Sequence, residues 1–76
     1  MGLLHCFAEN LRKYRNARGY SQEYLSELSG LHRTYISALE RERRNISIAN
    51  IEKIASALDL EPYLLFVPEK ADIQQL

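Results

Sequence analysis

The spacing of the apolar residues constrains the fold of this chain most strongly, because they recur every three or four positions along almost its whole length. That period is typical of amphipathic α-helices, and the alternation typical of β-strands is scarce. Gly19 and Gly30 interrupt the pattern early, and Pro62 and Pro68 interrupt it late. Together with a polar loop at residues 43–45, these breaks divide the chain into five short helical segments.

The helix boundaries follow from residues that start or stop helices. The first helix is predicted over about residues 4–18, and the third over about residues 33–41. Ser21 and Ser47 are suited to cap the second and fourth helices, because a serine hydroxyl accepts a hydrogen bond from the first turn. Pro62 suits the first turn of a fifth helix. We therefore expect an all-α domain over residues 1–68, followed by a C-terminal tail, residues 69–76.

The same spacing predicts which side chains face inward. Each helix has a stripe of apolar residues on one side, and these stripes are expected to meet in a single core. The expected core positions are Leu4, Phe7, Leu11, Tyr14, Tyr24, Leu25, Leu28, Ile36, Leu39, Ile51, Ile54, Ala55 and Leu58.

The charges are balanced overall but unevenly distributed. Ten Lys and Arg residues match ten Asp and Glu residues. Residues 1–45 carry eight basic and five acidic side chains, a net of +3, whereas residues 46–76 carry two and five, a net of −3. A basic half favours a surface for a polyanion, although the neutral total excludes a polybasic tail.

Several classes of protein are disfavoured by composition. The single cysteine, Cys6, cannot form an internal disulfide, which fits a reducing bacterial cytoplasm. No apolar run approaches the ~20 residues of a membrane span, and the N-terminus lacks the features of a signal peptide. His5, Cys6 and His32 lack the spacing of a metal site or a catalytic pair. We therefore expect no membrane association, no metal, no cofactor and no enzymatic activity.

Residues 21–40, SQEYLSELSGLHRTYISALE, carry a family resemblance. They resemble the helix-turn-helix core of the XRE family, which includes the phage repressors and Cro. The matching positions are Gln22, Leu25, Ser26 (usually alanine), Gly30, Ile36 and Glu40. The resemblance covers about residues 7–66. It implies a five-helix, lambda-repressor-like DNA-binding domain whose second and third helices form the helix-turn-helix.

A narrower resemblance lies in residues 33–47, RTYISALERERRNIS. This string is similar to the controller proteins of type II restriction–modification systems. The resemblance implies a homodimer that binds a palindromic operator in double-stranded DNA, activating and then repressing transcription. It implies no small-molecule effector.

The exposed face of the third helix carries the expected base contacts. An arginine can bridge the O6 and N7 atoms of guanine, and a threonine can contact a base or the thymine methyl. The resemblance places direct readout at Arg33, Thr34, Ser37 and Ala38. Contacts to phosphate or within a groove are expected from Ser21, Gln22, Tyr35, Arg41, Arg43, Arg44 and Asn45. The alternative is that these residues form an ordinary solvated surface.

Two further expectations concern assembly. The resemblance implies a structural ion pair between Arg15 and Glu40 that orients the third helix. It also assigns the late apolar cluster to the dimer interface: Pro62, Tyr63, Leu64, Leu65 and Phe66. The alternative is that this cluster fills the core of one subunit.

Two other functions stay open from the sequence. A phage-type repressor or a stand-alone XRE regulator would share every DNA-contact residue. An antitoxin-like module would instead bind a protein partner, although the short tail at residues 69–76 leaves little room for a toxin-binding segment.

Overall fold

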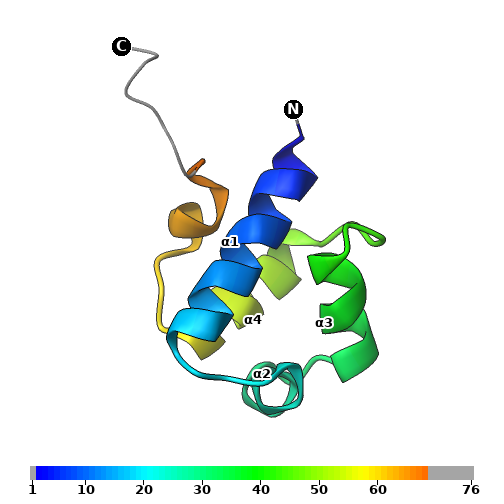
Figure 1. Cartoon of the computed structure of the whole chain (residues 1–76), viewed down its shortest axis with the longest axis vertical. Coiled ribbons are helices and arrows are strands. Elements are labelled where there is room, and N and C mark those ends of the chain that lie inside the picture. Colours follow the sequence, from blue (N-terminus) through cyan, green and yellow to red (C-terminus); the bar gives the residue numbers. More distant parts are fainter. Residues whose placement is uncertain (1, 69–76) are drawn as a thin grey trace.

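The computed structural model describes residues 2–68, and these residues form four α-helices and one short 3₁₀ helix. The elements are α1 (Leu3–Ala17), α2 (Gln22–Ser29), α3 (Arg33–Glu40), α4 (Ile48–Leu58) and η1 (Pro62–Phe66). In Figure 1, α1 crosses the molecule between η1 on one side and α3 on the other. The tail at residues 69–76 lies outside the described residues.

The prediction of five α-helices is wrong for the last element. η1 has only five residues, with Pro62 at its start, and the Leu64 N–H donates to the Glu61 carbonyl three residues earlier. Such tight i→i+3 turns are used in short pieces. Pro68 follows two residues after η1 and lacks the N–H that a longer helix needs. The all-α class is confirmed for residues 2–68.

Both predicted serine caps are confirmed. The Ser21 hydroxyl accepts a hydrogen bond from the Tyr24 N–H at 2.9 Å, and the Ser47 hydroxyl accepts one from the Asn50 N–H at 3.1 Å. Gly30 ends α2 with a φ of 79°, a left-handed conformation that glycine adopts without strain. This glycine makes the sharp turn between α2 and α3, so the helix-turn-helix follows from local sequence.

The core lies where α1, α2, α3, α4 and η1 meet. Its fully buried large side chains are Phe7, Leu11, Leu25, Ile36, Leu39, Ile54, Leu58 and Leu65. Tyr24 and Leu28 were expected in this core, but they are 46% and 44% exposed. The short helix α2 turns Leu25 and Ser29 inward instead, and this leaves its neighbouring positions on the surface.

The late apolar cluster is divided between core and surface. Leu65 was expected in the dimer interface, but it is 0% exposed and belongs to the core of this subunit. Tyr63 is 66% exposed, and Leu64 and Phe66 are half-buried. The 3₁₀ winding turns Leu65 alone fully inward, so any pairing surface at η1 consists of the remaining residues.

Candidate nucleic-acid interface

α3 presents one polar face and one buried face. Arg33 and Thr34 are exposed in its first turn, and Ser37 and Ala38 are half-buried one turn later. Ile36, Leu39 and Glu40 are buried. None of the four predicted base-reading residues belongs to this buried set. The small Ser37 and Ala38 side chains allow another surface to approach the helix axis closely.

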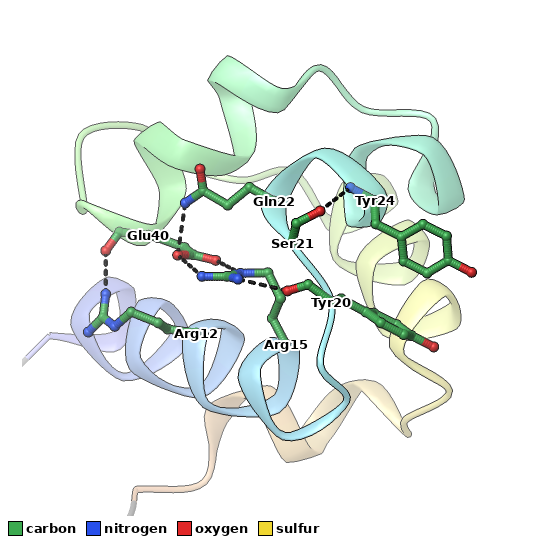
Figure 2. Close-up of polar contacts among 7 residues, drawn as sticks. All are labelled: Arg12, Arg15, Tyr20, Ser21, Gln22, Tyr24 and Glu40. Carbon is green, nitrogen blue, oxygen red and sulfur yellow. Dashed lines mark hydrogen bonds and ion pairs between the residues drawn. The ribbon is translucent and has the colours of Figure 1, made fainter.

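A buried ion pair connects α3 to α1, as Figure 2 shows. Arg15 Nε lies 2.6 Å from Glu40 Oε2, and Arg15 Nη2 donates to Glu40 Oε1 at 3.0 Å. The two side chains are 12% and 5% exposed. The hydrogen bond and the negative charge of Glu40 raise the pKa of Arg15 above its ordinary value. The predicted pairing of these two residues is present, in the bidentate geometry that fixes orientation.

Further donors surround the same carboxylate. Gln22 Nε2 donates to Glu40 Oε1 at 3.1 Å, and Arg15 Nη1 donates to the Tyr20 carbonyl at 2.9 Å. Arg12 Nη1 donates to the Glu40 backbone carbonyl at 2.8 Å, at the C-terminal end of α3. Figure 2 shows Gln22, Arg12 and Arg15 converging on Glu40, with Arg15 also bound to Tyr20. The network therefore connects the start of α2 and the end of α3 to α1.

Gln22 thus binds Glu40 within the subunit, in addition to its predicted contact with phosphate. Its side chain is half-buried, and its amide has a second N–H besides the one that Glu40 accepts. Ser21 is exposed, and its hydroxyl caps α2. Both residues lie at the N-terminus of α2, where backbone N–H groups and the helix dipole favour an anion.

The loop after α3 is exposed and basic. Arg41, Arg43, Arg44 and Asn45 all lie on the surface. Glu42 has a φ of 62°, and its carboxylate accepts a hydrogen bond from His5 Nδ1 at 2.7 Å. Glu9 lies 3.2 Å from His5 Nε2. These two carboxylates raise the pKa of His5. The acidic residue inside the basic loop is therefore paired with α1.

Tyr35 holds this loop against α3. Its hydroxyl donates to the Asn45 carbonyl at 3.4 Å and accepts from Asn50 Nδ2 at 3.2 Å. The Arg44 guanidinium lies 5.0 Å from the centre of the Tyr35 ring. These contacts position the loop, and the predicted contact of Tyr35 with phosphate or a groove stays a prediction.

An open groove of about 520 Å³ runs between the N-terminal end of α3 and this loop. Its lining residues are Gly30, Leu31, His32, Thr34, Tyr35, Arg44 and Asn50. His32 and Asn50 were not predicted as site residues, and no local motif marks them. Thr34 and Arg44 bring a predicted base contact and a predicted phosphate contact to the same groove.

Residues 2–68 contain no group of three or more His, Cys, Asp or Glu side chains that is placed to hold a metal ion. In the same part of the chain, no helix has the length and hydropathy needed to cross a membrane.

Comparison with known proteins gives consistent matches. Residues 11–65 match the model of HTH_3, a helix-turn-helix family. A relative described as a hypothetical transcription factor from Neisseria meningitidis is 51% identical over 61 residues, which cover 80% of this chain. The match covers 58% of that relative, so this chain spans little more than half of its length.

Two solved structures are similar to this chain in fold as well as in sequence. The restriction-modification controller protein C.AhdI from Aeromonas hydrophila has a TM-score of 0.81 and 52% identity, covering 83% of this chain and 96% of its own. The controller protein C.Esp1396I was solved as a tetramer in complex with its natural 35 base-pair operator. It has a TM-score of 0.80 and 36% identity, covering 87% of each chain.

Proposed function

Because the chain belongs to the HTH_3 family of helix-turn-helix proteins, we propose that it is a sequence-specific, DNA-binding transcriptional regulator, and specifically a restriction–modification controller protein. It binds a palindromic operator as a homodimer in the bacterial cytoplasm, activating and then repressing transcription. The observation that carries this proposal is the exposed Arg33–Thr34 turn of α3, held in place by the buried pair of Arg15 and Glu40.

Base readout is assigned to α3. The side chains of Arg33 and Thr34 reach base edges in the major groove, while Ser37 and Ala38 allow the helix to lie close to the bases. Arg33 is the main source of discrimination, since a bidentate contact to guanine contributes about 1–3 kcal/mol against the wrong base.

Phosphate contacts position the protein without reading sequence. They come from the N-terminus of α2, through Ser21 and Gln22, and from the basic loop, through Arg41, Arg43, Arg44 and Asn45. Tyr35 supports that loop from behind. Each phosphate neutralised by an arginine releases counterions, so binding weakens as salt rises.

Pairing of two subunits places two copies of α3, the recognition helix of each subunit, on one face of DNA. The pairing surface consists of Pro62, Tyr63, Leu64 and Phe66 of η1, with Leu65 excluded because it is buried. The tetramer of C.Esp1396I on its operator supports assembly on DNA as the mode of action. Two-fold symmetry predicts half-sites about 34 Å apart, one turn of the duplex.

The test is a footprint of the purified protein on the DNA upstream of its own gene, at physiological salt with random DNA as competitor. We expect one or two protected palindromes. Two adjacent palindromes next to a restriction gene support the controller role, in which the first dimer activates and the second represses.

Two results would overturn parts of the proposal. A palindrome far from any restriction gene would replace the controller role with that of a phage-type or stand-alone regulator. No protection at micromolar protein would reject the DNA-binding function, and a stoichiometric protein partner on pull-down would then support an antitoxin-like module.

A further inference from the structure

Asn10 is a buried polar residue that sequence reasoning did not single out. It lies in the middle of α1 and is 4% exposed. Asn10 Nδ2 donates to the Leu65 carbonyl at 3.1 Å and to the Val67 carbonyl at 2.9 Å. It also lies 3.5 Å from Cys6 Sγ. The two N–H groups of its amide are therefore directed at the C-terminal end of η1.

η1 is held against α1 and α4. A five-residue 3₁₀ helix is too short to be stable alone. The contacts that hold it include the Leu65 side chain in the core, the stack of Phe66 on Phe7 at 5.5 Å, and the Asn10 hydrogen bonds. Apolar burial is non-directional, whereas hydrogen bonds have a narrow range of distance and angle. Asn10 therefore defines where along α1 the segment is seated.

The same helix holds α3 from another position. Arg12 binds the backbone carbonyl of Glu40, and Arg15 binds its carboxylate. Within two turns, α1 thus carries the contacts that fix η1 and the contacts that fix the recognition helix. The position of η1 on α1 determines how far apart, and at what angle, a two-fold axis at η1 places two copies of α3.

We propose that Asn10 is a specificity-determining positioning residue, which sets the half-site spacing that the paired subunits accept. This inference rests on the proposed function. Adding one base pair between half-sites moves them apart by about 3.4 Å and rotates one relative to the other by about 35°. When η1 is fixed in position on α1, the paired subunits cannot follow either change in the DNA. When η1 can shift on α1, they can follow both changes in part.

The test uses the full chain and four duplexes: the footprinted palindrome, the same palindrome with one base pair added or removed at its centre, and one isolated half-site. In Asn10→Leu, the leucine side chain is similar in volume to asparagine and has no hydrogen-bond donor. Asn10→Ser keeps one donor and covers the case in which Asn10→Leu does not fold, as judged by circular dichroism. Ile54→Val is the matched control, because it weakens the core at a fully buried position and leaves the Asn10 bonds intact.

For the wild type we expect a loss of about 100-fold on the altered spacings, corresponding to about 2.8 kcal/mol. For Asn10→Leu we expect about tenfold weaker binding to the natural palindrome and less than about fivefold discrimination between spacings. Asn10→Ser should fall between the two. Affinity for the isolated half-site should be unchanged, and Ile54→Val should keep the wild-type discrimination.

If both folded Asn10 variants discriminate between half-site spacings as strongly as the wild type, this inference is overturned, while the proposed function stands. An equal loss on the half-site would also overturn it, because Asn10 would then act through the recognition helix. A wild type that binds none of the palindromes would overturn the proposed function together with this inference.

Discussion

Arg33 is the residue on which base discrimination is expected to depend most. Its side chain is exposed in the first turn of α3, so truncation removes no core packing. We expect Arg33→Ala to lose about 1–3 kcal/mol of affinity for the operator and far less for random DNA. Competition binding at fixed salt measures both affinities.

The matched control for this substitution is Lys53→Ala, which removes an exposed basic side chain on α4. It should change both affinities little. Equal losses of Arg33→Ala on operator and random DNA would assign Arg33 to phosphate contact.

His5 makes stability depend on pH. Its pKa is raised above 6.5, because the hydrogen bond and charge of Glu42, followed by the charge of Glu9, favour the imidazolium form, while the positive charge of Arg12 opposes it. A raised pKa in the folded state means that protonation stabilises the fold. The contribution is full below the unfolded value and is lost as pH rises through the raised value.

The measurement is the melting temperature of the wild type and of His5→Gln at pH 5.5 and pH 8.5. The wild type should exceed the variant by more at the acidic pH. A difference of the same size at both pH values would contradict the role of the charged imidazole.

At the scale of elements, the position of the loop after α3 is expected to depend on Tyr35. Tyr35→Phe keeps the ring under Arg44 but removes the hydrogen bonds to Asn45 and Asn50. We expect the loop to become more mobile. Because it would then lose more conformational entropy on binding DNA, the affinity should fall about threefold to tenfold. Filter binding should show a similar loss on operator and random DNA. A loss confined to the operator would indicate that the hydroxyl reads a base.

The helix starts were predictable because their causes are local. Ser21 and Ser47 each bind a backbone N–H three residues ahead, and Gly30 supplies a left-handed turn. The exposed face of α3 also follows from its own periodicity, since Ile36 and Leu39 turn inward. The pair of Arg15 and Glu40 was found through the family resemblance, because no local spacing connects the two residues.

The contacts that were missed join residues far apart in the chain. Glu42 meets His5 across 37 positions, and Asn10 meets Leu65 across 55. Nothing in the neighbouring sequence of Asn10 specifies which carbonyls it will bind. The burial of Leu65 was missed for a related reason, because a 3₁₀ turn directs side chains differently from the α-helix that the spacing suggested.

For the whole molecule, pairing is predicted to depend on the surface of η1. Tyr63 is 66% exposed, so Tyr63→Glu should leave the subunit folded. Near a two-fold axis the substitution places two negative charges close together, and like charges at an interface are costly. We expect the dimer dissociation constant to rise by at least about tenfold.

Analytical ultracentrifugation measures this constant directly. Leu28→Glu is the matched control, since Leu28 is 44% exposed on α2, away from η1. It should leave the dissociation constant unchanged. If Leu28→Glu separates the subunits and Tyr63→Glu does not, the pairing surface lies at α2.

The placement of α1 between η1 and α3 also affects how such a protein diversifies. α3 and the end of η1 are attached to α1 through different residues: Arg12 and Arg15 bind Glu40, whereas Asn10 binds the Leu65 and Val67 carbonyls. Under the proposed function, substitutions on the outer face of α3 change the bases that are recognised while the distance between half-sites stays the same. A lineage with this architecture can therefore acquire a new operator through single steps that each leave a paired, foldable protein.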